Sequence, residues 1–98
     1  MPLPVEIRSR DGALRVEYAV NVSSSGLGLH LPHPLPAGET LALGFELPDG
    51  GGRIEARGRV AWVEAIRRTA RARLREAGIR FEVLREEDRR RLARFAAR

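Results

Sequence analysis

Residues 14–23 carry the pattern that most constrains the fold, because a large apolar side chain stands at every second position from Leu14 to Val22. The apolar members are Leu14, Val16, Tyr18, Val20 and Val22. Alternation with a period of two is typical of a β-strand that buries one face only. We therefore expect the apolar set to point into a core, and Asn21 and Ser23 to face solvent together.

Five further segments show strand patterns separated by turn signals, namely residues 5–8, 26–31, 40–47, 54–63 and 79–83. Asp11-Gly12 and the glycine-rich stretch 48–52 are typical hairpin turns. A helix is predicted from Glu86 onward, since three acidic residues open it and arginines follow, the order that the helix dipole favours. Six short strands and one capping helix favour a mainly β fold, a closed antiparallel barrel in a single domain of residues 1–98.

Several positions give finer expectations about this barrel. Gly58 inside a strand indicates a bend or bulge. Val83 is expected to point inward, and Leu92 and Phe95 lie on one face of the terminal helix that packs onto the barrel. The aromatic residues Phe45, Trp62 and Phe81 are also predicted to face inward. An outer stacking platform for single-stranded nucleic acid is then missing.

Residues 64–77 differ in character from the rest, being rich in Ala, Arg, Glu and Leu. Ile66, Ala70 and Leu74 recur every four residues, which predicts an inserted arginine-rich helix. Ala70, Ala72 and Leu74 also alternate, so a long hairpin arm is the alternative.

The charge of the chain favours anionic partners: it holds 18 arginines, no lysine and 13 acidic residues, for a net charge of +5. Such a surface attracts nucleotides, nucleic acid or anionic lipid, although a GC-rich genome also favours arginine codons. The absence of cysteine excludes disulfides and thiolate chemistry. There is no long apolar run and no signal-peptide layout, so we expect a cytoplasmic protein without a membrane span.

Nothing in the sequence favours catalysis. His30 and His33 are the two histidines, and no neighbouring acid completes a metal or proton-transfer set. The G-x-S-x-G, P-loop and dinucleotide motifs are missing. We therefore expect no enzyme, no catalytic or metal-binding residue, and no cofactor.

The segment 21–26 is the best candidate for a binding site. Asn21 and Ser23 end a strand, and Gly26 closes the turn that follows. An exposed amide and hydroxyl beside turn N–H groups form a polar notch that suits a base edge or a phosphate oxygen. The alternative is that these side chains only satisfy the turn with local hydrogen bonds.

The run N-x-S-x-x-G at 21–26 resembles the D/N-x-S-x-x-G motif of the PilZ domain family. The resemblance continues through residues 36–41, the G-x-V-x-W-V run at 58–63, the G-I-x-F run at 78–81 and the closing helix at 84–95. It is strongest to the PilZ-like paralogues of myxobacteria-type genomes. It implies a six-stranded barrel with a C-terminal helix, and a non-enzymatic bacterial module that binds the second messenger cyclic di-GMP.

One part of the family pattern differs in this sequence. Cyclic di-GMP receptors of the family carry R-x-x-x-R in an arm before the first strand, whereas residues 1–4 alone precede it here. Arg8 and Arg10 lie nearest to that place but have a different spacing. The first hypothesis is a cyclic di-GMP receptor that uses Asn21, Ser23 and Gly26 with Arg8 and Arg10. The alternative is an adaptor that docks onto a protein partner in signalling or motility and does not bind the nucleotide.

Nucleic acid is the partner that the sequence favours least. It would bind through the arginines of residues 67–75, which are Arg67, Arg68, Arg71, Arg73 and Arg75.

Overall fold

The computed structural model describes residues 3–33, 35–68 and 73–97. These residues form six strands and one helix in the predicted order. The elements are β1 (Leu3–Arg8), β2 (Leu14–Val22), β3 (Gly26–Leu31), β4 (Thr40–Glu46), β5 (Arg53–Arg68), β6 (Arg73–Leu84) and α1 (Glu86–Ala96).

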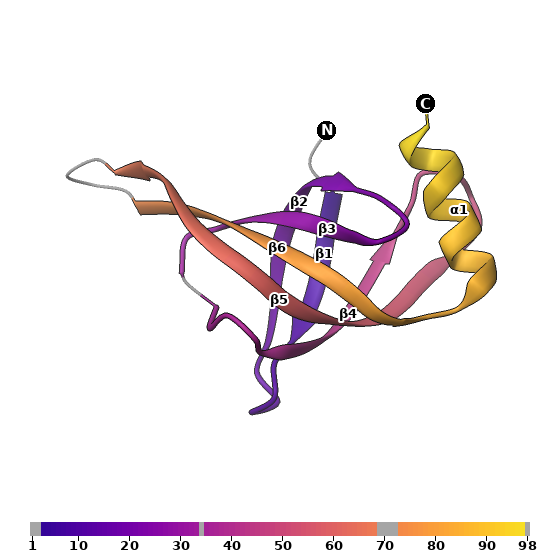
Figure 1. Cartoon of the computed structure of the whole chain (residues 1–98). Helices are drawn as coiled ribbons and strands as arrows, with labels where there is room; N and C mark the ends of the chain where they lie inside the picture. The colour runs from indigo at the N-terminus through magenta and orange to yellow at the C-terminus, as the bar shows by residue number, and fades with distance from the viewer. Residues whose placement is uncertain (1–2, 34, 69–72, 98) are drawn as a thin grey trace.

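The strands close into an antiparallel barrel in the order β1-β2-β3-β6-β5-β4 (Figure 1). β1 completes the closure because it pairs with β2 on one side and with β4 on the other. Every pair is antiparallel. This confirms the barrel and the C-terminal helix predicted from the sequence.

The barrel is filled mainly by aliphatic side chains. The alternating leucines of β3 and β4 are buried as predicted, and the rings of Phe45 and Phe81 stack with centroids 6.3 Å apart. The helix adds Leu92, which is fully buried, and Phe95, which packs against the core. The register shift between Arg57 and Gly58 confirms the bulge expected at Gly58.

The facing of β2 is opposite to the prediction over most of its length. Leu14 and Tyr18 are 55% and 53% exposed, whereas Glu17 and Ala19 are buried. Residues directly opposite each other share a face of the sheet, and Ala19 lies opposite the buried Leu3 of β1. Glu17 and Ala19 of β2 therefore face inward, and the apolar residues on either side of them face outward.

A register shift between Ala19 and Asn21 reverses this facing near the end of β2. Asn21 is exposed as predicted, and Val22 is half-buried against the core. The buried carboxylate of Glu17 is compensated by Arg15, whose Nε lies 3.7 Å from a carboxylate oxygen. The apolar stripe of β2, defined by Leu14, Val16, Tyr18 and Val20, is therefore an outer surface.

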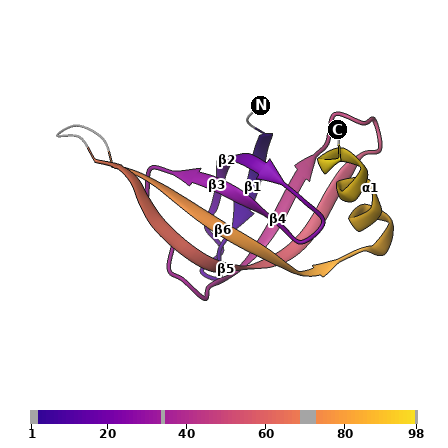
Figure 2. The ribbon, with the colours of Figure 1, turned by 45° about the horizontal axis from the view of Figure 1, so that its top comes forward.

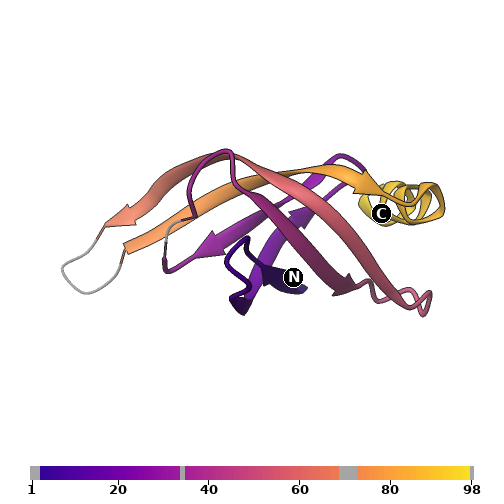
Figure 3. The same cartoon turned by 90° about the horizontal axis from the view of Figure 1, so that it is seen from below.

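The predicted helix over residues 64–77 is wrong, and the alternative, a hairpin arm, is confirmed for the described residues. β5 and β6 extend beyond the barrel with Ala65 opposite Arg75 and Arg68 opposite Arg73. Strand structure prevails because β3 pairs with β6 as far as Arg75, so the segment is part of the barrel ladder. Ala70, Arg71 and Ala72 lie outside the described residues. Figure 3 shows the arm and α1 at opposite ends of the molecule.

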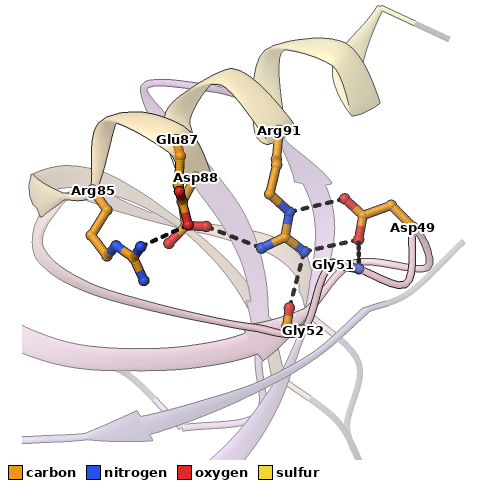
Figure 4. Close-up of polar contacts among 7 residues, drawn as sticks. All are labelled: Asp49, Gly51, Gly52, Arg85, Glu87, Asp88 and Arg91. Carbon is orange, nitrogen blue, oxygen red and sulfur yellow. Dashed lines mark hydrogen bonds and ion pairs between the residues drawn. The ribbon is translucent and has the colours of Figure 1, made fainter.

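The helix α1 lies beside the β4–β5 loop (Figure 2). A single arginine joins the two (Figure 4). Arg91 donates through Nε and Nη2 to the two carboxylate oxygens of Asp49, at 3.0 and 2.8 Å, and through Nη1 to the buried Asp88 at 3.0 Å. Its Nη2 also donates to the Gly52 carbonyl at 3.0 Å. These hydrogen bonds hold the pKa of the Asp49 carboxyl well below its ordinary value and raise the pKa of Arg91.

Candidate ligand-binding cleft

The predicted polar notch is one wall of an open cleft of about 380 Å³. The end of β2, the following turn and the start of β3 form this wall, and β5 and β6 form the other. The lining residues include Asn21, Ser23, Gly26, Trp62 and Arg80. The volume lies at the lower end of the range for small-ligand sites.

Ser23 is committed to the turn, as the alternative interpretation of this segment expected. Its Oγ accepts the Ser25 N–H at 3.2 Å and lies 3.0 Å from the Ser25 hydroxyl. Its backbone N–H donates to the Gly26 carbonyl at 2.8 Å. The hydroxyl of Ser23 therefore shapes the wall of the cleft, and a ligand would have to share it with the turn.

Asn21 is free of such contacts within the part of the chain that the structure describes. Its exposed side chain lies over Gly28, where an added β-carbon would come within 3.0 Å of both amide heteroatoms. Glycine at position 28 thus leaves room for the amide. The donor and the acceptor of Asn21 remain available to a ligand.

Trp62 faces the cleft, which corrects the prediction that it points inward. Its side chain is 43% exposed, because the ladder between β5 and β6 shifts register between Val60 and Trp62. The indole lies over Gly78, where a β-carbon would overlap the ring. The barrel therefore has an outer aromatic platform, and the argument against single-strand binding from inward aromatic residues does not hold for Trp62. Val83 is likewise exposed, because the shift at Arg57 and Gly58 places it on the outer face opposite Arg57.

Arg80 brings positive charge to the same cleft. It lies opposite Gly26 on the neighbouring strand, is exposed, and makes no ion pair with any described residue. Gly26 allows this close pairing because a β-carbon there would overlap the Ile79 carbonyl. The cleft thus joins an amide, an indole and a guanidinium.

Arg8 and Arg10 are not brought to this cleft. Arg8 pairs with Leu14, whereas Leu3, at the other end of β1, pairs with Ala19 beside Asn21. Both arginines line a different cleft, beside β4 and β5. The structure therefore groups Asn21, Ser23 and Gly26, and it adds Trp62 and Arg80, which the sequence reasoning missed. The sequence did hold a signal for Arg80: it lies between Ile79 and Phe81 of the G-I-x-F run, which are both predicted to point inward, so Arg80 itself must face outward.

The sequence and the fold together define a small closed β-barrel module with a C-terminal helix and an open polar cleft. The PilZ domain family matches residues 1–98, and the chain belongs to this family. PilZ domains are non-enzymatic signalling modules of the cyclic di-GMP receptor type.

Solved structures share the fold at low sequence identity. The inhibitor of motility MotI/DgrA of Bacillus subtilis is 19% identical with a TM-score of 0.81, over 99% of this chain and 46% of that one. The PilZ domain with c-di-GMP of YcgR from Escherichia coli is 15% identical with a TM-score of 0.77, over 98% of this chain and 79% of that one. MrkH of K. pneumonia is 16% identical with a TM-score of 0.79, over 99% of this chain and 44% of that one.

The chain therefore spans about half the length of MotI and MrkH. No curated protein matches the sequence. Within the described residues, no helix has the length and apolar character needed to span a bilayer.

Proposed function

We propose that this PilZ domain is a cytoplasmic receptor for cyclic di-GMP and that the nucleotide binds in the cleft between Asn21 and Trp62. The observation that carries the proposal is the meeting of three side chains beside the family's N-x-S-x-x-G turn: the exposed indole of Trp62, and the amide of Asn21 and the guanidinium of Arg80, which have no partner among the described residues. Each group matches one part of the ligand.

The chemistry assigns each side chain a role. The Trp62 indole stacks on a guanine base, an interaction worth about 1–3 kcal/mol per base. The Asn21 amide hydrogen-bonds the edge of that base, and Arg80 donates to a phosphate oxygen. A charge-assisted hydrogen bond of this kind contributes about 1.5–3 kcal/mol.

Isothermal titration of cyclic di-GMP at moderate salt tests the proposal. We expect binding by the unaltered protein and at least tenfold weaker binding by Asn21→Ala, Trp62→Ala and Arg80→Gln. Arg85→Gln is the matched control, since Arg85 is exposed and its ion-pair partner is the exposed Glu87. No heat at high micromolar protein, or equal weakening in the control, would contradict the proposal.

The role that the sequence predicts for Arg8 and Arg10 is tested in the same titration. Their distance from the cleft along β1 favours Arg80 as the main phosphate ligand. Arg8→Gln with Arg10→Gln should then leave the affinity within about threefold, whereas a tenfold loss would assign these two arginines to the ligand.

The apolar stripe of β2 supports the second candidate, a protein-binding adaptor. Leu14, Val16 and Tyr18 are each more than half exposed on one outer face. Exposed apolar patches of this kind mark interaction sites. The adaptor function would be favoured over the receptor function if cyclic di-GMP fails to bind to a folded protein.

A further inference from the structure

On the outer face of the barrel, a row of residues across the neighbouring strands β1, β4 and β5 holds the side chain of Arg53 between two acids. Glu6 lies opposite Gly44, which lies opposite Glu55. The Arg53 guanidinium lies over Gly44, with Nη2 2.8 Å from a Glu6 carboxylate oxygen and Nε 3.0 Å from a Glu55 oxygen. The two carboxylates thus hold a cation over a small central residue, and they raise the pKa of Arg53.

The next row on the same face has the opposite charge. Arg8 lies opposite Ala42, which lies opposite Arg57. These residues are two positions along each strand from Glu6, Gly44 and Glu55, so they share the same outer face. Here two arginines flank a small residue, and no carboxylate among the described residues forms an ion pair with either of them.

The pairing of the arginines in this row is incomplete. Arg8 donates to the Gly12 carbonyl at 3.0 Å, and Arg57 has no hydrogen bond or ion pair within the described part of the chain. The acids of the neighbouring row, Glu6 and Glu55, are already bound to Arg53. Arg8 and Arg57 thus place two positive charges on either side of β4 without an acid of their own, and such a concentration of one charge attracts an anion from outside.

The row forms part of a cleft of about 580 Å³ that gathers more positive charge. Arg10 and Arg59 line it as well, and Glu39 is the acid in its lining. Arg59 is paired with Glu82 at 3.0 Å, whereas Arg10 is exposed and has no partner among the described residues. Thr40 and Ala42, both small, lie among the arginines.

We propose that this cleft, called here the Ala42 cleft, binds the phosphate groups of a small anionic ligand between Arg8 and Arg57. Strands lie about 4.8 Å apart, so the two backbones are separated by roughly 10 Å, a span that two long side chains close around one phosphate. Guanidinium forks match phosphate oxygens in pairs. With Arg59 already paired to Glu82, three arginines face one acid in the lining, which suits a multiply charged phosphate better than a single carboxylate.

The site is separate from the proposed cyclic di-GMP cleft and shares no lining residue with it. It lies at the opposite end of β1 from Asn21. A failure of cyclic di-GMP to bind would therefore leave this proposal unaffected, and the reverse also holds.

The test is a titration with inorganic pyrophosphate, followed by calorimetry and by backbone amide shifts in NMR. We expect saturable binding with the largest shifts near Ala42 and Thr40. Arg8→Gln with Arg57→Gln should weaken binding at least tenfold. The matched control is Arg85→Gln with Arg90→Gln, which removes the same charge from exposed positions of α1 and its N-terminal cap. Equal weakening in both double variants, or shifts centred on α1, would overturn the proposal.

A second pair of variants tests the same site without removing any arginine. Ala42→Glu places a carboxylate between the two arginines, as Arg53 places a cation between the two acids, and should raise the melting temperature and abolish pyrophosphate binding. Ala42→Gln has nearly the same size without the charge and should do neither. A lower melting temperature for Ala42→Glu than for Ala42→Gln would contradict the proposal. Arginine-dependent binding of a short DNA duplex without binding of pyrophosphate would also overturn it.

Discussion

Arg89 of α1 donates through Nη1 to the backbone carbonyl of Ser24 at 2.7 Å, and so joins the C-terminal helix to the turn of the candidate ligand cleft. The next carbonyl, that of Ser25, accepts the Phe81 N–H of β6 at 2.9 Å. The turn is therefore held from two sides by elements that follow it by more than fifty residues. This arrangement fixes the backbone of the N-x-S-x-x-G segment before any ligand arrives.

Replacing Arg89 tests whether the helix orders the turn. Arg89→Gln removes a charge-assisted hydrogen bond, and we expect a loss of about 1 kcal/mol in the free energy of unfolding, because the side chain is partly solvated. We also expect faster amide exchange at Ser25 and Gly26, measured by NMR. Arg90→Gln is the control, since Arg90 is exposed one position along the same helix. Unchanged exchange at the turn in Arg89→Gln would show that β6 alone holds it.

Replacing Gly26 or Gly28 of the cleft with alanine should have different effects on stability and on binding. Gly26→Ala forces a β-carbon against the Ile79 carbonyl, a backbone atom that cannot move away. We expect a loss of about 1–3 kcal/mol of stability, the usual cost of overpacking, measured by urea denaturation. Gly12→Ala is an informative comparison, since no atom lies within 4 Å of the added carbon and its cost comes from the positive φ of 87°.

Gly28→Ala should separate ligand binding from stability. The added carbon meets the Asn21 amide at 3.0 Å, and that exposed side chain has room to rotate away. We expect a small change in melting temperature and at least a tenfold loss of cyclic di-GMP affinity, since Asn21 would no longer lie over residue 28. Circular dichroism first shows that the variant is folded, and isothermal titration calorimetry then measures its affinity for cyclic di-GMP. Retained affinity would mean that the amide does not touch the ligand.

The sequence predicted the barrel well because its turns and alternating strands are local signals. Asp11-Gly12, the leucines of β3 and the acid-first helix each depend on residues within a few positions of one another. The facing of β2 was not predictable in this way, because it depends on its register against Leu3 in another strand. Register shifts next to Asn21 and Trp62 then changed which residues reach the surface.

The hairpin arm and the members of the cleft also depend on partners that are distant in the chain. The apolar spacing of residues 66–74 suits a helix, but the pairing of β3 with β6 as far as Arg75 favours a strand. Arg80 could be assigned to the cleft only once its pairing with Gly26 was known. Asn21 and Ser23 were found from sequence because a strand end and its turn are adjacent in the chain.

The fastening of α1 by Arg91 predicts a large effect from a single substitution. Asp88 is 3% exposed, and Arg91 is its hydrogen-bonding partner in the described structure. Arg91→Ala leaves this buried carboxylate unpaired, which costs about 3–5 kcal/mol in comparable pairs. Arg94→Ala, exposed on the same helix, should cost less than about 0.5 kcal/mol. Urea denaturation of the two variants measures this difference in the free energy of unfolding. Similar denaturation midpoints for both variants would show that Asp88 finds another partner.

The Asp49–Arg91 pair gives the stability a defined pH dependence. Its hydrogen bonds keep the pKa of the Asp49 carboxyl below the ordinary value of 3.8. A carboxyl whose folded-state pKa is lowered contributes stability above its unfolded-state pKa and loses it as the pH falls through the folded-state value. The melting temperature of Asp49→Asn should therefore lie below that of the unaltered protein by a constant amount from about pH 8 to about pH 5. Below about pH 4 the difference in melting temperature should narrow. The Asp49 carboxyl of the unfolded protein then binds a proton while that of the folded protein stays ionised, so the unaltered protein loses the stability that the variant never had. Thermal denaturation in matched buffers measures this, and a difference that already narrows between pH 7 and pH 5 would mean that another group titrates with the pair.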